Sequence, residues 1–598
     1  MPQLMPLEGS LFLGSKGEIM STVRPSKVWP VAAALGLALT IGTPLTASAQ
    51  GGFFATPQPP PVYTPAKDAK DLKSVLFNWT WHMGMLRGVD EHEIVASLEY
   101  QGTGTIQVNG QPCKLTKYRV STNYQTPGQR VQYSCLRGGT MVTNVEVVSG
   151  PYAWNESIPG AELVAGHGKA TPMPNAARER LIRLWASAQG APKAALAGTT
   201  QPDPNQLPND GKTSIGTTSV QWEGNKPVVT FAIPGVPGAT ATAVLNDQWM
   251  AESVVVKEGS TTTELTYGNY ADWNNELNKV QAFYAGKIVE KRNGTVIRDL
   301  TTTETETGSI YVVMPVPASV KAAIKNPGPS PAIATVSRGD RADPPPRNEP
   351  TPRLANGKPD MTGAWGAAGM NWRYGFRRCA PNQGADCTNI WNQTIDFEFE
   401  APPRYGPNRP IYKPELWDKV QQLDQWTNKD DPVMTCLPLG IPRQGPPARI
   451  YQTDKDIAFL YRGGVDGGGG YPAFRVIPTD GRKHDPQQAE VTRFFGYTVG
   501  RWEGDTLVLD SISFDDRTWL SRGGFFHSDQ MHVIEKLTRK GNEILYEVTI
   551  EDPKVLVEPW VMTPRTMRLA PIPDAGLLGE SGACEVYELE DITSQIRH

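Results

Sequence analysis

The spacing of apolar residues is what most limits the fold of this chain. The apolar segments are short, many of them alternate with polar residues, and turns are frequent because the 598 residues include 58 Gly and 53 Pro. Alternation with a period of two is typical of strands that bury one face. Together with the turns it favours antiparallel β domains over a helical or doubly wound fold. We therefore expect a mainly β protein with two antiparallel domains: a half-barrel with helices, then an up-and-down, barrel-like sheet.

A Pro-rich segment divides the chain. Residues 318–355 have the composition of a linker and contain three clusters of proline. This predicts a half-barrel-like domain over residues 71–317 and a barrel-like domain over residues 356–598, with a Pro-rich leading segment at residues 50–70.

Three helices are expected within this β-rich pattern. They are Leu72–His92, Ala176–Ala195 and Pro414–Trp426, of which the second has its large apolar residues at helical spacing. Consecutive hairpins after residue 456, at regular spacing, predict the up-and-down sheet of the second domain.

The first 49 residues have the organisation of a secretory signal peptide. A short basic segment precedes the apolar stretch Val31–Leu45, and Ala47-Ser48-Ala49 is a small-x-small cleavage site. The apolar stretch is too short to cross a bilayer, and a polar, Pro-rich segment follows it. We expect a signal peptide over residues 1–49, with Met20 as an alternative start, and export to the periplasm or beyond.

Charge and cysteines fit an exported protein. The formal net charge is -4 with both signs interspersed and no Lys/Arg run, so we expect no nucleic-acid partner. Because the apolar stretch of the leader is too short to span a bilayer, we also expect no membrane span in the mature protein. All six cysteines lie in the exported part, where an oxidising compartment favours disulfides. A thiolate metal site or a catalytic thiol is the alternative, but the chain has no Cys-x-x-Cys. The candidate pairs are Cys113 with Cys135 across a hairpin, Cys379 with Cys387 around a small loop, and Cys436 with Cys584 over a long range.

Ordered motifs in the second half resemble an uncharacterised family of exported, β-rich bacterial proteins. The motifs are Arg501-Trp502-Glu503-Gly504-Asp505-Thr506-Leu507-Val508-Leu509-Asp510, then His527-Ser528-Asp529 with His532-Val533-Ile534-Glu535, and Val548-Thr549-Ile550-Glu551-Asp552-Pro553. The likeness covers most of residues 356–595 and implies no particular activity. This chain departs from the family pattern in having Asp529 in place of Glu and a Gly-rich insertion at residues 464–470.

The first half resembles the β-rich module that precedes the hydrolase domain in some exported metallo-β-lactamase-like proteins. The matching residues are Tyr152-Ala153-Trp154-Asn155, Leu184-Trp185 and Leu245-Asn246-Asp247-Gln248. The His-x-His-x-Asp-His metal core of those hydrolases is absent, so their reaction is not implied. Such modules are similar to lipoprotein-carrier half-barrels that hold apolar ligands, which is an analogy of fold.

The densest group of ionisable residues in the second half is His527, Asp529, His532 and Glu535. On an ideal strand, His527, Asp529 and Glu535 share one face and His532 lies on the other. A metal site from this segment alone would need a bulge to bring three or four ligands together. We therefore predict no cofactor, and a divalent metal is the lesser alternative.

Proton transfer is the chemistry that these residues suggest. Asp552 extends an apolar strand stripe, and a partly buried carboxylate beside a histidine can move protons at neutral pH. Arg475 is a candidate counter-charge for such a carboxylate. The predicted catalytic residues are His527, Asp529, Glu535 and Asp552, and the predicted substrate-binding residues are Arg475, Asp516, Trp519 and His532.

A structural interpretation of the same residues stands beside this one. In it, Arg475, Glu535 and Asp552 form ion pairs that only stabilise the fold, and Asp515-Asp516 caps a turn.

Three functions follow from these patterns. The first is an exported enzyme without a cofactor that performs elimination, hydration or hydrolysis on a small apolar or aromatic molecule. The second is a non-catalytic periplasmic carrier or sensor of a lipid-like ligand, and the third is a structural component of the envelope.

Overall fold

The computed structural model describes the chain from residue 63, and the predicted signal peptide and most of the Pro-rich leading segment lie outside the described residues. The described residues are 63, 65–85, 95–273, 283–308, 310–333, 345–367, 376–377, 393–394, 407–425, 430–461, 473–521 and 523–570.

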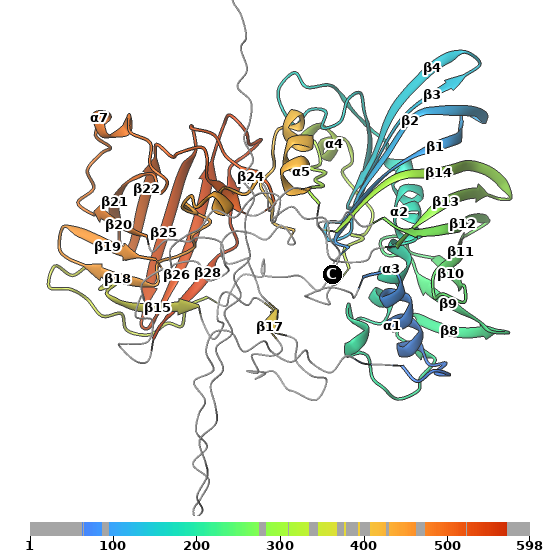
Figure 1. The fold of residues 1–598 in the computed structure, drawn as a ribbon, viewed down its shortest axis with the longest axis horizontal. Helices are drawn as coiled ribbons and strands as arrows, with labels where there is room; N and C mark the ends of the chain where they lie inside the picture. Colours follow the sequence, from blue (N-terminus) through green and yellow to red (C-terminus); the bar gives the residue numbers. More distant parts are fainter. Residues whose placement is uncertain are drawn as a thin grey trace, which may run out of the picture. The chain divides into compact units, whose positions relative to one another are not determined.

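The first part of the described chain forms a sheet of fourteen strands, called here the curved sheet (Figure 1). All of its neighbouring strands are antiparallel, and their order is β6-β5-β4-β3-β2-β1-β14-β13-β12-β11-β10-β9-β8-β7. The strands are β1 (Ser97–Val108), β2 (Gln111–Asn123), β3 (Gly128–Arg137), β4 (Thr140–Ser149), β5 (Tyr152–Glu156), β6 (Ala170–Pro172), β7 (Ser214–Ile215), β8 (Thr218–Glu223), β9 (Lys226–Ala232), β10 (Ala239–Leu245), β11 (Ala251–Glu258), β12 (Thr261–Asp272), β13 (Phe283–Arg292) and β14 (Thr295–Gly308).

The centre of the curved sheet is the pairing of its first and last strands. β1 pairs with β14, and one meander runs outward from each of them. β14 has no counterpart in the sequence analysis, because its buried side chains include Thr302, Thr305 and Thr307 rather than a row of apolar residues. β-branched threonine favours a strand, but it gives no alternation between apolar and polar residues.

Three helices pack on one face of the curved sheet (Figure 1): α1 (Leu72–His82), α2 (Ala177–Trp185) and α3 (Gly190–Gly198). The prediction of a single helix over Ala176–Ala195 is wrong. The Ser187 hydroxyl donates to Leu184 O and accepts from the Gly190 N–H, which ends α2 and starts α3. A Cβ at Gly190 would lie 2.2 Å from Leu184 O, so the break depends on glycine.

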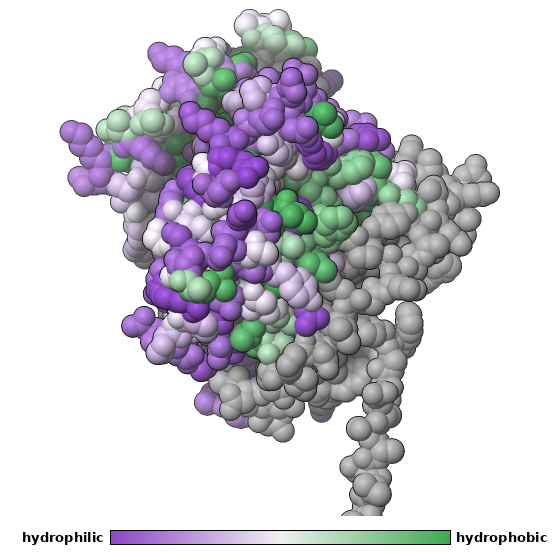
Figure 2. Space-filling view, turned by 90° about the vertical axis from the view of Figure 1, so that its left-hand side faces the viewer, coloured by the Kyte–Doolittle hydropathy of each residue, from purple (hydrophilic) through white to green (hydrophobic). Residues whose placement is uncertain are grey.

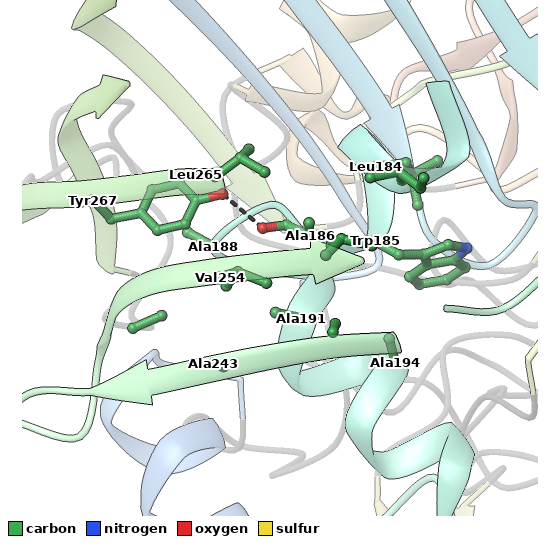
Figure 3. Packing of buried hydrophobic residues seen from close by; sticks show 14 of the residues in the cluster. Leu184, Trp185, Ala186, Ala188, Ala191, Ala194, Ala243, Val254, Leu265 and Tyr267 are labelled. Carbon is green, nitrogen blue, oxygen red and sulfur yellow. Dashed lines mark hydrogen bonds between the residues drawn. The ribbon is translucent and has the colours of Figure 1, made fainter. Parts of the chain in front are cut away.

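Small side chains let these helices approach the sheet closely. Ala188, Ala191 and Ala194 are fully buried, and Figure 3 shows them beside strands of the curved sheet. Ala243 on β10 belongs to the same apolar cluster. The Tyr267 hydroxyl on β12 donates to the carbonyl of Ala186 at 2.6 Å, which ties the end of α2 to the sheet.

The C-terminal part forms a nearly closed antiparallel barrel. Its strand order is β20-β19-β18-β15-β28-β26-β25-β22-β21, and β27 (Trp560–Val561) pairs with β26 beside this path. The path strands are β15 (Gly363–Ala367), β18 (Arg449–Gln452), β19 (Asp456–Leu460), β20 (Phe474–Pro478), β21 (Tyr497–Glu503), β22 (Thr506–Ile512), β25 (His532–Lys540), β26 (Glu543–Glu551) and β28 (Arg565–Leu569).

The barrel confirms the predicted up-and-down order. The strands follow one another in sequence around the barrel, and β15 pairs with both β18 and β28, so the first strand meets the last. The seam lies between β20 and β21, where the Gly481 N–H donates to Gly500 O at 3.0 Å. The mainly β fold class is therefore as expected.

The remaining elements are short. They include α4 (Ala318–Ala323), α5 (Trp417–Gln425) and α7 (Pro486–Ala489), and the strand pairs β16 (Phe376–Arg377) with β17 (Gln393–Thr394) and β23 (Trp519–Ser521) with β24 (Phe525–Phe526). Over the described ranges, every helix is too short or too polar to cross a membrane. The face in Figure 2 is largely hydrophilic, and hydrophobic residues are scattered over it in small groups.

One predicted disulfide is confirmed. Cys113 on β2 and Cys135 on β3 are bonded across the hairpin, as the sequence suggested. Cys436 is also disulfide-bonded. Its predicted partner Cys584, and the predicted pair Cys379–Cys387, lie outside the described residues.

Candidate functional site

The interior of the barrel holds a buried ion pair. Arg475 on β20 donates to both carboxylate oxygens of Glu535 on β25, at 2.7 and 2.9 Å. The Tyr546 hydroxyl also donates to Glu535, and Arg475 donates to the hydroxyls of Tyr461 and, more distantly, Thr498. Every charged atom of the pair thus has a partner from the wall of the barrel.

This surrounding favours the charged form of Arg475. Burial opposes the charged guanidinium, but the adjacent Glu535 carboxylate holds the pKa of Arg475 above its usual range. Burial raises the pKa of both Tyr461 and Tyr546. A carboxylate held by two guanidinium N–H groups and a phenol is a poor general base, because protonation would break a buried charge pair. The structural interpretation therefore describes Arg475 and Glu535 well.

His527 and Asp552 lie in a second buried group, at the loop that precedes β25. The His527 Nδ1–H donates to Ser528 O at 2.9 Å, and its Nε2 accepts from the Thr518 hydroxyl at 2.7 Å. Asp552 accepts from the Ser528 N–H and hydroxyl, both at 2.7 Å. Burial lowers the pKa of His527 and keeps the ring neutral. Asp552 is bound to neutral donors, so it is not the ion pair that the structural interpretation expected.

His532 lies on the opposite side of its strand from Glu535, as the alternation predicted. It is half-buried, and its two ring nitrogens face the carboxylates of Glu551 and Asp510 at 3.0 Å each. The hydrogen bond with Asp510 raises the pKa of His532, and Glu551 adds to this rise. The pKa of Asp510 is lowered in return. This imidazole therefore bridges three neighbouring strands, β22, β25 and β26.

The other predicted site residues are placed apart from these groups. Asp529 is exposed and pairs with Lys554, which lowers the pKa of Asp529. Asp516 is exposed beside Asp515, whose carboxylate accepts from the N–H and side chain of Arg517 and so organises the turn. Trp519 is buried on β23.

Sequence reasoning missed a larger polar cluster on the inner face of the curved sheet, called here the arginine cluster. Arg183 on α2 donates to Glu146 on β4 at 3.1 Å, and Arg298 on β14 donates to Glu290 on β13 at 2.6 Å. At the rim, Glu179 pairs with both Arg183 and Arg292. Arg180, one helical turn before Arg183 and Leu184, completes the cluster.

The arginine cluster reveals how strongly the sheet bends. β4 and β14 are four strand positions apart, which in a flat sheet would separate them by about 19 Å. Yet Arg298 Nη2 lies 3.8 Å from Glu146 Oε2. The sheet therefore curls until side chains from its two halves meet, with Arg183 from helix α2 between them.

The arginines of this cluster keep its carboxylates ionised. Burial alone would raise the pKa of Glu146, but Arg183 and Arg298 keep it below its usual range. Burial alone would also raise the pKa of Glu179, but the hydrogen bond from Arg292 and the nearby charge of Arg183 lower it to about 2. Both carboxylates are thus ionised at any physiological pH.

A row of tyrosines adjoins the arginine cluster. Tyr118, Tyr100 and Tyr284 come from β2, β1 and β13, and successive ring centroids lie 6.1 and 5.1 Å apart. Tyr133 on β3 pairs with Tyr118 across the hairpin. Burial raises the pKa of Tyr118, and the positive charges of Arg298 and Arg183 oppose this rise. The tyrosine row therefore lies close enough to the arginine cluster to be affected by its charge.

Only a weak signal in the sequence pointed to this region. Arg180 and Arg183 lie on a helix whose neighbouring residues Leu181, Leu184 and Trp185 are apolar. The carboxylates come from strands that are distant in the sequence, and no local pattern brings them together.

Metal ligands do not gather in the part of the chain that the structure describes: no three His, Cys, Asp or Glu side chains there are placed to hold an ion.

Comparisons with known proteins leave the family open. No family model matches the chain, and no curated protein matches its sequence. Among solved structures, the chain is similar to a LolA superfamily protein from Nitrosomonas europaea, with 9% identity and a TM-score of 0.22. The match covers 41% of this chain and 96% of that protein. A likeness at this level assigns neither a family nor a function.

Proposed function

We propose that the protein binds a small apolar or aromatic molecule inside the curved sheet without converting it. The observation that carries this proposal is the tyrosine row beside an apolar interior. Tyr118 and Tyr284 are almost fully buried and belong to an apolar cluster that spans the sheet and helices α1–α3. Aromatic and apolar linings with a few polar groups are typical of small-molecule sites.

The state of the acid/base candidates favours binding over turnover. Glu535 is held by Arg475, Asp552 by Ser528, and His527 is a neutral ring with both nitrogens engaged. A general acid or base must be free to exchange a proton with a substrate. These three groups instead stabilise the barrel.

The setting of this function is an oxidising compartment outside the cytoplasm. The Cys113–Cys135 bond agrees with the predicted export, because such bonds persist in the periplasm and beyond. We further propose that the curved sheet and the barrel are separate domains, with their boundary in residues 318–355.

Native mass spectrometry of protein purified from its own compartment tests the proposed function. We expect extra mass that is lost on denaturation, and the same compound should be recovered unchanged after prolonged incubation with the protein. Recovery of a converted product would contradict the proposal.

Binding of the neutral fluorophore N-phenyl-1-naphthylamine locates the site. Tyr284→Ala should weaken binding by about tenfold, the loss expected from about 1.4 kcal/mol of ring contacts. Tyr461→Ala is the matched control, because it removes an equally buried tyrosine from the barrel. Equal loss in both variants would place the site elsewhere.

His532 favours a second candidate function, acid/base catalysis. Its imidazole is partly exposed and is flanked by Asp510 and Glu551, which suits a group that exchanges protons near neutral pH. In this alternative the barrel would perform elimination, hydration or hydrolysis on the same class of molecule. A bell-shaped pH–rate profile that His532→Gln abolishes would support it, and conversion that His532→Gln leaves unchanged would exclude this residue.

A further inference from the structure

Arg180 is a buried cation that contacts no carboxylate among the described residues. Its side chain donates to two backbone carbonyls, Val147 O at 2.8 Å and Trp154 O at 2.6 Å, and to the amide oxygen of Asn155. All three acceptors are neutral, and the residue is only 6% exposed. Burial lowers the pKa of Arg180 to about 10, so it remains positively charged at neutral pH. Glu146 and Glu179 favour the charge of Arg180 without contacting it, and burying a charge that lacks a direct counter-ion is costly.

Two neighbouring guanidinium groups have unused donors. The Nε–H groups of Arg183 and Arg298 are buried and have no hydrogen-bond acceptor among the described residues. Glu290 Oε2 lies 3.6 Å from Arg183 Nε, which is an ion-pair contact just beyond hydrogen-bond distance. Buried donors are almost always paired in folded proteins, so two such groups in one cluster require an explanation.

The charge balance of the arginine cluster also leaves positive charge uncompensated. Its four cations are Arg180, Arg183, Arg292 and Arg298, and its three anions are Glu146, Glu179 and Glu290. These seven residues therefore carry one net positive charge.

We propose that the ligand of the curved sheet is an anionic amphiphile, whose single negatively charged group binds Arg180, Arg183 and Arg298 while its apolar body lies along the tyrosine row. This inference rests on the proposed function and gives its ligand a chemical class. A carboxylate, sulfonate or phosphate ester supplies the acceptor oxygens that guanidinium groups prefer.

Two fluorophores with the same ring skeleton test the charge preference. We would measure the affinity of N-phenyl-1-naphthylamine, which is neutral, and of 1-anilinonaphthalene-8-sulfonate, which carries one negative charge. The full mature protein should bind the sulfonate at least about tenfold more tightly, a difference of about 1.4 kcal/mol.

The sharpest variant is Arg180→Met, because it removes the charge and orphans no carboxylate. It should abolish the preference for the sulfonate and leave the affinity for the neutral fluorophore within about twofold. Arg178→Met is the matched control on the same helix, since Arg178 is exposed and pairs with Glu258 outside the cluster. The double variant Arg298→Met/Glu290→Gln, which keeps the charge balance, should also lower the preference.

The outcomes separate the two proposals. If neither fluorophore binds, the proposed function is overturned and this inference with it. If the neutral fluorophore binds and the sulfonate does not, the inference alone is overturned. Equal affinities, or a preference that survives Arg180→Met, overturn the inference alone.

Inorganic phosphate distinguishes an amphiphile from a free anion. If phosphate binds and neither fluorophore is displaced, the cluster is a site for a small anion and the amphiphile is excluded.

Discussion

Two buried arginines in this protein have opposite surroundings, and they therefore predict opposite responses to substitution. Arg475 is neutralised by Glu535 and surrounded by hydroxyls, whereas Arg180 donates only to neutral oxygens. Removing one member of a buried pair leaves the other charge without compensation. Arg180 contacts no carboxylate among the described residues, so its removal breaks no ion pair.

Glu535→Gln should therefore destabilise the barrel strongly. We expect a loss of about 3–5 kcal/mol in the free energy of unfolding, because Arg475 would remain buried and unpaired. Urea unfolding followed by barrel tryptophan fluorescence measures it. In the double variant Arg475→Met/Glu535→Leu most of this loss should be recovered. Additive losses in the double variant would show that the pair is not the source.

His532 and His527 should give the folded protein opposite pH dependences. The pKa of His532 is raised, so its contribution to stability is complete below the unfolded value of about 6.5 and is lost as the pH rises through the folded value. The pKa of His527 is lowered, so its contribution is lost as the pH falls. His532→Gln should therefore lower the free energy of unfolding most near pH 5.5, and His527→Gln should lower it most above pH 7. Each loss should be about 1 kcal/mol. Unfolding curves at several pH values measure both, and a His532 effect that grows with pH would contradict the assignment.

At the scale of elements, the close packing of the helices on the curved sheet makes small residues necessary. Ala243 is fully buried between helix and sheet, while Thr242 beside it points to the other face. Ala243→Leu should cost about 1–3 kcal/mol through overpacking. Thr242→Leu is the control on the same strand and should change the stability by less than about 0.5 kcal/mol. Thermal unfolding distinguishes the two, and equal effects would mean that the helix can move away from the sheet.

Local patterns in the sequence predicted what depends on neighbouring residues. The β class and the opposite faces of His532 and Glu535 follow from a period of two, and the Cys113–Cys135 bond follows from two cysteines that flank a probable hairpin in an exported chain. β14 was missed because its inward residues are threonines, and the break between α2 and α3 because Ser187 and Gly190 resemble ordinary helix residues in a short apolar run.

The arginine cluster could not be predicted in the same way. Its members Glu146, Arg183 and Arg298 come from β4, α2 and β14, and they meet only because the sheet curls. Curvature is a property of the whole sheet, and no single segment encodes it. The same holds for the barrel, where Arg475 finds Glu535 sixty residues further along the chain.

At the scale of the whole molecule, the position of each sheet's closing strands predicts how the chain unfolds. The curved sheet is completed by the pairing of β1 with β14 before the Pro-rich segment, and the barrel by the pairing of β15 with β28 after it. Each sheet thus closes on its own strands. Cooperative units in proteins tend to follow such self-contained pairing.

Substitution of one buried tryptophan in each sheet tests this independence. Trp365 is almost fully buried on β15, and Trp185 is fully buried at the end of α2. Trp365→Ala should cost about 3–5 kcal/mol and lower only the barrel transition, because the cavity lies among barrel residues. The affinity for N-phenyl-1-naphthylamine should not change. Trp185→Ala should lower the stability of the curved sheet and weaken the binding of N-phenyl-1-naphthylamine.

Hydrogen exchange read by mass spectrometry assigns each loss of protection to β1–β14 or to β15–β28. A single transition that both variants lower equally would make the two sheets one cooperative unit, and would move the boundary of folding away from the Pro-rich segment.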